Sequence, residues 1–221
     1  RASVIMDTGL SGMPKYSARA HAGLLAFEYG FGKDRVIVNC GTTPVAGKWR
    51  DLLKSTAAHS TLVVDNRNAC HFDDNGQLTV RPEMSVMRRE DDHAAEILAS
   101  HSGYMPRYGL VHHRRLSLLD AGETLEGEDI LSGKAGAHFA VRFHLHPCIQ
   151  ASLIQEGSEV LLRARSGIGW RFSAENAVLT MEDSVYAGEG DAPRRALQIV
   201  LNGVTSAPET QVKWQLCRDK I

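Results

Sequence analysis

The chain has 221 residues, with 25 Lys and Arg against 26 Asp and Glu, and this length is enough to bury a sizeable core in one domain. The balanced charge gives no electrostatic field that would attract nucleic acid or an anionic membrane. No apolar run approaches the ~20 residues that a membrane-spanning helix needs, so we expect neither nucleic acid nor a membrane as a partner.

Apolar and polar residues alternate along nearly the whole chain, which is the period of β-strands. In chain order, we predict strands at 4–6, 24–31, 35–39, 61–65, 85–89, 96–101, 110–119, 124–131, 138–146, 151–155, 159–164, 169–172, 177–182, 196–202 and 211–217. Tight turns separate them, including one at Asn75-Gly76. Residues 48–55 are the only predicted helical turn. This pattern favours an all-β chain, a large antiparallel β-sandwich (supersandwich-like) in which residues 1–221 form a single domain.

The first residues of the chain already have the pattern of a β-strand. It opens Arg1-Ala2-Ser3-Val4-Ile5-Met6, with neither an initiator Met nor a signal peptide. We therefore expect a processed or excised piece of a longer protein, from which the localisation signals have been lost.

Three segments of the first third resemble the β-sheet domain of heparinase II/III-like polysaccharide lyases, which are related to alginate lyases. They read RAHAGLLAF at 19–27, NCGT at 39–42 and KSTAAHST at 54–61. Their order and spacing agree with the family, and the third segment is the most specific match. Later hairpins resemble the bacterial branch, so the resemblance covers nearly the whole chain. This chain corresponds to only one domain of the family's proteins. It implies a missing N-terminal helical toroid and a periplasmic location.

The resemblance implies β-elimination on a uronate-containing polysaccharide of the heparan or alginate kind. Such a reaction needs a base, an acid for the leaving oxygen, and a group that neutralises the carboxylate. In the family some of these groups come from the toroid, and the β domain can add a His or a Tyr. This chain has Arg19 at the His position, and Pro44 and Val45 where the Tyr would follow Gly-Thr. Arg19 is the one catalytic candidate, as a bidentate clamp for a substrate carboxylate; the alternative is a solvated charge at a strand edge.

The resemblance also implies a structural zinc ion at His21, Asn39 and His59. Imidazole and carboxylate are good zinc ligands, but Asn39 offers only a neutral and weaker oxygen. In the alternative interpretation, the two histidines form hydrogen bonds inside the sandwich without a metal, and Asn39 bridges them through its amide.

The predicted helical turn carries the candidate substrate-binding residues, Trp49 and Arg50. Trp49 would stack on a sugar ring and Arg50 would contact an anion. The alternative is a core Trp beside a surface Arg. The pairs Arg88-Arg89, Arg114-Arg115 and Arg194-Arg195 are most simply solvated charges.

A further candidate comes from His144 and His146, which share one face of a predicted strand. That spacing is also found in metal-binding jelly rolls, although a polar outer face explains it as well. The sequence thus leaves three functions open. The first is the β-sandwich of a polysaccharide lyase, inactive without its toroid and acting with it on an acidic polysaccharide. The others are a non-catalytic glycan-binding or structural module, and a cupin-like metal enzyme.

Overall fold

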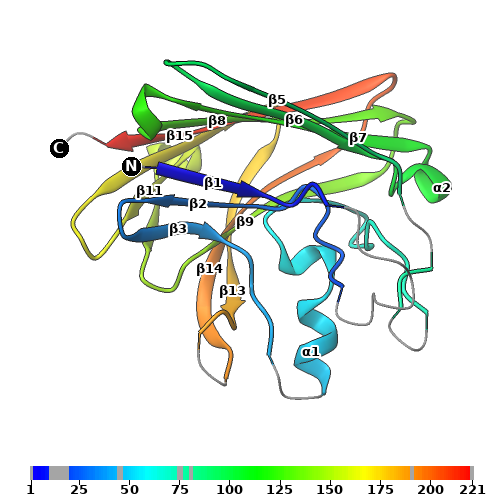
Figure 1. The fold of residues 1–221 in the computed structure, drawn as a ribbon, viewed down its shortest axis with the longest axis horizontal. Coiled ribbons are helices and arrows are strands. Elements are labelled where there is room, and N and C mark those ends of the chain that lie inside the picture. The colour runs from blue at the N-terminus through cyan, green and yellow to red at the C-terminus, as the bar shows by residue number, and fades with distance from the viewer. Residues whose placement is uncertain are drawn as a thin grey trace.

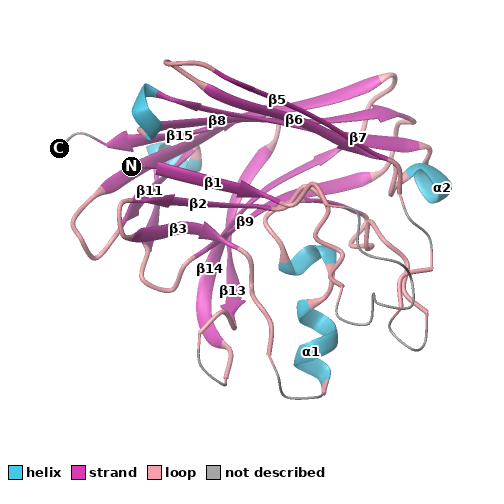
Figure 2. Ribbon diagram, in the orientation of Figure 1, coloured by secondary structure: helices cyan, strands magenta, loops and turns pink. Residues whose placement is uncertain are grey.

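A computed structural model describes residues 2–9, 20–43, 47–73, 77–79, 82–189 and 192–219. It is 57% strand and 10% helix, in two antiparallel sheets with no barrel, so the predicted all-β sandwich is confirmed. The two sheets face each other, and the few helical turns lie at their margins (Figures 1 and 2).

The first sheet has seven strands, with the path β1-β2-β3-β9-β14-β13 and β4 paired to β9. Their bounds are Ala2–Met6 (β1), Phe27–Phe31 (β2), Asp34–Val38 (β3), Leu62–Val64 (β4), His138–Leu145 (β9), Val178–Tyr186 (β13) and Arg194–Val204 (β14). Strand β9 therefore pairs with partners from both ends of the chain.

The second sheet has eight strands in the order β10-β11-β12-β15-β8-β7-β6-β5. Their bounds are Met84–Glu90 (β5), Ala95–His101 (β6), Leu110–Leu119 (β7), Thr124–Gly133 (β8), Gln150–Ile154 (β10), Glu159–Arg163 (β11), Gly169–Glu175 (β12) and Glu209–Asp219 (β15). Each neighbouring pair is antiparallel, as the hairpin pattern of the sequence predicts.

The predicted helical turn is present as α1, Lys48–Leu53, but it is not the only one. A second helix, α2, spans Met105–Tyr108, and 3-10 turns span 56–58, 120–122 and 155–157. No helix among the described residues is long and apolar enough to cross a membrane. The strand predicted at 24–31 begins only at Phe27, because Leu25 turns the chain with a φ of 56°. The predicted Asn75-Gly76 turn lies outside the described residues.

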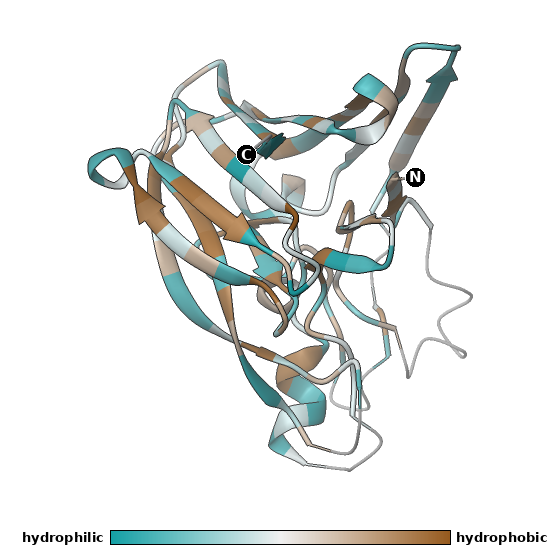
Figure 3. Cartoon of the chain, turned by 90° about the vertical axis from the view of Figure 1, so that its left-hand side faces the viewer, coloured by the Kyte–Doolittle hydropathy of each residue, from teal (hydrophilic) through white to brown (hydrophobic). Residues whose placement is uncertain are grey.

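Aromatic side chains from both sheets meet in the core. Trp214 of β15 packs against Phe27 and Phe143 of the first sheet, with ring centroids 5.5 Å and 4.8 Å away, and against Phe172 of its own sheet at 6.0 Å. Gly127 of β8 leaves room for the indole, since a Cβ there would lie 2.0 Å from it. Hydrophobic and hydrophilic residues are interspersed along the strands (Figure 3), as expected when one face of each sheet is buried.

A buried ion pair within the second sheet corrects the interpretation of Arg114 as a solvated charge. The Arg114 and Asp129 side chains are fully buried; Arg114 Nε donates to Asp129 Oδ1 at 2.8 Å and Nη2 donates to Oδ2 at 3.1 Å. Arg114 Nη1 donates to the carbonyls of Leu25 and Ser60, which precede strands of the other sheet. The guanidinium therefore pins two loops of the first sheet to the second, and only its neighbour Arg115 is exposed.

Candidate functional site

The structure brings two of the predicted zinc ligands into direct contact. Nδ1 of His21 and Nε2 of His59 lie 3.2 Å apart, and the rings meet edge to face. His59 lies in the loop that joins α1 to β4, and its Nδ1 donates to the carbonyl of Ser55 at 2.7 Å. Gly23 permits this packing, because a Cβ at that position would lie 2.6 Å from the His59 ring. We call His21 and His59 the histidine pair.

The hydrogen bonds of the histidine pair fix where its protons lie. Because His59 Nδ1 carries the hydrogen that bonds Ser55, its Nε2 in the neutral ring has a lone pair. His21 Nδ1 must then donate to it, which leaves the lone pair of His21 on Nε2. Burial lowers the pKa of His59 to about 4. Burial, and secondarily the charge of Lys54, also lowers the pKa of His21. Both rings are therefore neutral at pH 7.

Asn39 uses its amide for other partners than the histidine pair. Its Oδ1 accepts from the backbone N–H of Ser60 at 2.9 Å, and its Nδ2 donates to Glu28 Oε1 at 3.3 Å. The same Glu28 oxygen accepts the backbone N–H of Asn39 at 3.2 Å. The amide thus links β3 to the start of β4 and does not bridge the histidines.

The histidine pair offers part of a zinc site. Two imidazole nitrogens bound tetrahedrally at 2.0–2.1 Å would lie about 3.3 Å apart, close to the separation seen here, and the Ser55 carbonyl orients His59 as an outer-shell acceptor does. A third ligand is the difficulty, because the Asn39 oxygen is neutral and already bonded. In the described part of the chain, no group of three or more His, Cys, Asp or Glu side chains has a metal-binding arrangement.

The candidate for carboxylate binding, Arg19, lies outside the described residues, as do Pro44 and Val45. Trp49 and Arg50 are on α1. Trp49 is 45% exposed, so the alternative of a core Trp is wrong, whereas its role in stacking on a sugar stays a prediction. Leu53 holds the helix against the outer side of the first sheet by packing with Cys40, Ala58 and Ala187.

His144 and His146, the basis of the cupin-like alternative, have separate partners. His144 Nε2 donates to the carbonyl of Ala57 at 3.0 Å, and its Nδ1 accepts from the Ser184 hydroxyl at 2.7 Å. His146 Nδ1 accepts the backbone N–H of Cys148 at 3.2 Å, which leaves the proton on Nε2. In both rings the lone pair on Nδ1 already accepts a hydrogen bond, and both side chains are buried, so the structure brings them together neither as a metal site nor as a solvated outer face.

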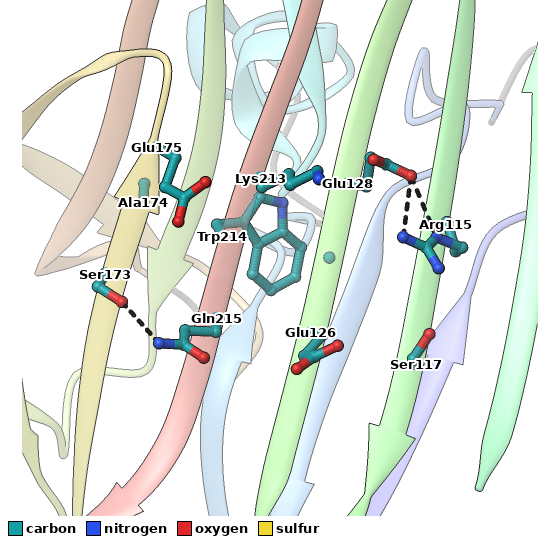
Figure 4. Close-up of a pocket in the computed structure, with 11 residues that line it drawn as sticks. Arg115, Ser117, Glu126, Glu128, Ser173, Ala174, Glu175, Lys213, Trp214 and Gln215 are labelled. Carbon is teal, nitrogen blue, oxygen red and sulfur yellow. Dashed lines mark hydrogen bonds and ion pairs between the residues drawn. The ribbon is translucent and has the colours of Figure 1, made fainter.

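The second sheet carries a groove among the described residues, and Figure 4 shows its side chains. Three carboxylates line it, Glu126, Glu128 and Glu175, with Arg115 and Lys213 as the basic residues. Arg115 is already paired with Glu128 at 3.1 Å. The groove is therefore acidic on balance, and it would repel an acidic polysaccharide.

Sequence reasoning missed a polar cluster at the edge of the first sheet. Arg35 of β3 contacts Glu28 of β2, Tyr186 of β13 and Glu189 just beyond β13. Arg35 and Glu189 are far apart in the chain, so no spacing rule places them together. The sequence marks this cluster only by Arg194-Arg195, a pattern that solvated charges also explain.

The family model described as "Heparinase II/III-like, C-terminal" matches residues 1–215. A curated relative, the FtsZ-localized protein C of Caulobacter vibrioides, is 32% identical over 234 residues, which is 97% of this chain and 40% of that protein. The chain thus spans 40% of the curated relative's length.

Among solved structures, the heparan sulfate lyase HepC from Pedobacter heparinus matches with a TM-score of 0.81 and 14% identity. A heparinase III, the BT4657 gene product, matches with a TM-score of 0.80 and 13% identity. Both matches cover 100% of this chain and 33% of the longer protein. At this identity the structural likeness concerns the fold.

Proposed function

Because the chain belongs to the heparinase II/III-like family, as a C-terminal domain of it, we propose that it serves a larger polysaccharide lyase as its β-sandwich domain. The observation that carries the proposal is the family match over residues 1–215. The substrate would be a uronate-containing polysaccharide of the heparan or alginate kind. In the reaction a base takes the proton at C5, the glycosidic oxygen leaves C4 and is protonated, and a C4–C5 double bond forms.

The histidine pair supports a contribution of this domain to the chemistry. A neutral imidazole is a competent base at pH 7, and the hydrogen bond to His59 leaves the lone pair of the half-buried His21 on Nε2. Elimination needs two more groups around the same sugar. Lys54 is a cation close enough for its charge to lower the pKa of His21, but the contacts of His21 with the described residues include no acid. We therefore propose that the remaining groups come from the missing N-terminal domain, with Arg19 as the clamp that this chain adds.

We propose no step through a metal ion. Zinc held by His21 and His59 would have a structural role and would need a third ligand that Asn39 supplies poorly. If zinc binds, replacing His21 should lower the zinc content and replacing His146 should not.

The test compares this chain alone with the longest protein that contains it. Each is incubated with heparan sulfate, heparin and alginate, and the absorbance of the C4–C5 double bond is followed. We expect no product from the chain alone and turnover by the longer protein, lost on His21→Ala and retained on Glu175→Gln in the acidic groove. Turnover by the chain alone, lost on replacement of Arg19 or His59, would show that the domain holds a complete site.

A second candidate is a non-catalytic glycan-binding or structural module. It is favoured by one observation: the relative named for its localisation with FtsZ is 32% identical to this chain, against 13–14% for the heparinases. In this case the longer protein would release no unsaturated product. Its fluorescent fusion would lie with FtsZ in the cell and would lose that position, or its glycan binding, when this domain is deleted.

A further inference from the structure

Three donors surround the carboxylate of Glu189, which follows β13. Arg194 Nη2 of β14 donates to Oε2 at 2.8 Å. Oε1 faces His146 Nε2 at 3.5 Å and Arg35 Nη1 at 3.7 Å. Two guanidinium groups, from β3 and β14, and the imidazole of His146, just after β9, thus point at one carboxylate. We call Arg35, His146, Tyr186, Glu189 and Arg194 the Glu189 cluster.

Tyr186 supports these donors from beneath. It is 1% exposed, and the guanidinium carbons of Arg35 and Arg194 lie 5.5 Å and 5.7 Å from its ring centroid. The His146 ring meets it edge to face at 5.0 Å, and Arg35 also donates to the Tyr186 hydroxyl. Cation–π contacts of this kind restrict the guanidinium groups, so the donors are held in place and not spread over a solvated surface.

His146 supplies an independent sign that this place is made for an anion. Its Nδ1 accepts the Cys148 N–H, so Nε2 carries the proton and points into the cluster. The residue is only 7% exposed, and among the described residues the one contact of its buried Nε2 is the ion pair with Glu189 Oε1 at 3.5 Å, which is too long for a good hydrogen bond. A buried donor left in this way is costly. An oxygen that came closer than Glu189 Oε1 would satisfy it.

Glu189 holds its position weakly. Its side chain is 51% exposed, and those of Arg35 and Arg194 are 44% and 47% exposed. Ion pairs with this exposure contribute little to stability, because water screens them. A second carboxylate can therefore take the place of Glu189 with little loss of folding free energy, while the donors stay on Tyr186.

From these contacts we propose that the Glu189 cluster is a binding site for the carboxylate of an acidic ligand, and that Glu189 is an internal occupant which this carboxylate displaces. The inference rests on the described contacts and not on the proposed function. It assigns to Arg35, Arg194 and His146 the recognition of one planar oxyanion through both of its oxygens.

The test is a titration of the isotope-labelled chain with sodium glucuronate, followed by NMR. Glucose serves as the uncharged comparison, and the ionic strength is kept equal because exposed charges are screened by salt. We expect weak, saturable binding of glucuronate with shifts at Arg194 and His146. Glu189→Gln removes the competing charge but keeps the side-chain shape, and it should tighten binding roughly fivefold. Arg194→Met keeps the apolar stem over Tyr186 and should weaken binding by at least about threefold.

The matched control is Glu175→Gln, which removes an exposed carboxylate from the other sheet and should leave the affinity unchanged. The proposal is overturned if glucuronate binds no better than glucose to both the parent chain and Glu189→Gln. It is equally overturned if Glu175→Gln tightens binding as much as Glu189→Gln, since net charge alone would then explain the gain. Circular dichroism verifies the fold of each variant, and Arg35→Met replaces Arg194→Met if the latter unfolds. Loss of lyase activity in the longer protein would leave this titration unaffected.

Discussion

Several histidines are buried in a neutral state, and acid should therefore destabilise the chain. Burial lowers the pKa of His59 to about 4 and that of His144 to about 3. Burial also lowers the pKa of His101 and His112. In the unfolded chain each of these rings titrates near its ordinary value of 6.5. As the pH falls below 6.5, these histidines become protonated in the unfolded chain but stay neutral in the folded chain. The stability that the neutral rings contribute is therefore present at pH 7 and is lost toward pH 4 and below.

The size of the effect follows from proton linkage. A histidine that has a pKa of 6.5 in the unfolded chain and stays neutral in the folded chain lowers the free energy of unfolding by about 2 kcal/mol between pH 7 and pH 5. His59 and His144 together should therefore lower the free energy of unfolding by about 4 kcal/mol over this interval, with further loss from His101 and His112. A domain has only about 5–15 kcal/mol in total, so the effect is large enough to measure.

Urea unfolding followed by tryptophan fluorescence at pH 7, 6 and 5 measures it. His144→Gln keeps a donor for the Ala57 carbonyl but cannot titrate, so the pH dependence should become shallower by about 2 kcal/mol over the interval. His138→Gln is the control, because His138 lies at the exposed start of β9. Equal stability at pH 7 and pH 5, or equal slopes for the two variants, would refute the assignment of neutral buried rings.

Three further substitutions test other parts of the structure. Asp129→Asn should lower the free energy of unfolding by about 3–5 kcal/mol in urea, because it leaves the buried Arg114 guanidinium without a counter-charge. Gly127→Ala should cost about 1–3 kcal/mol and lower the Tm, because the added Cβ would overlap the Trp214 indole. Asn39→Asp should raise the affinity for zinc, seen as a larger rise of Tm on zinc addition, because it supplies an anionic oxygen beside the histidine pair.

Each of these substitutions has a comparison that can contradict it. Arg195→Ala removes the ion pair between Arg195 and Asp183, whose side chains are 82% and 71% exposed. It should lower the free energy of unfolding by at most about 1 kcal/mol. An equally small loss for Asp129→Asn would show that the buried pair contributes no more than an exposed one. If Gly127→Ala is as stable as the parent chain, the Trp214 side chain can shift to make room for the added Cβ, and the reasoning is wrong. His21→Ala added to Asn39→Asp should abolish the zinc effect, and a gain that survives it would place the metal elsewhere.

The strands were predictable because alternation is a local property of the sequence. Strand β7 was predicted with its observed bounds, Leu110–Leu119. Sheet order was beyond this reasoning, since β9 pairs with β3, β4 and β14, which are distant in sequence. Helix α2 was missed because a four-residue helix has no amphipathic period to detect.

The facing positions of Arg114 and Asp129 follow from the sequence once the turn between their strands is located. The turn between β7 and β8, which contains the 3-10 turn at 120–122, sets the register of their hairpin, in which Leu119 pairs with Thr124. Counting back from this turn places Arg114 directly opposite Asp129. Opposite charges at facing positions stabilise a hairpin. The error was to assign Arg114 and Arg115 together, although strand neighbours point to opposite faces.

The site was predictable only where the family resemblance supplied it. His21 and His59 are separated by two strands, and the resemblance alone brought them together before the structure did. The Glu189 cluster has no comparable motif, because its residues lie on or just beyond four different strands, β3, β9, β13 and β14, and the order of these strands in the sheet was not predictable. Sequence reasoning can therefore identify site residues that belong to a family motif, but it cannot identify a site whose residues are brought together by strand pairing.

Asn39 shows why the inherited pattern cannot be carried over unchanged. An aspartate at this position could accept the Ser60 N–H as Asn39 does, but it could not donate to Glu28. It would instead place a second carboxylate beside Glu28, and like charges so close destabilise the fold when no cation is present. Glu28 in turn holds Arg35 of the Glu189 cluster at 3.3 Å. The neutral amide therefore suits its two hydrogen-bond partners, Ser60 and Glu28, better than a carboxylate would.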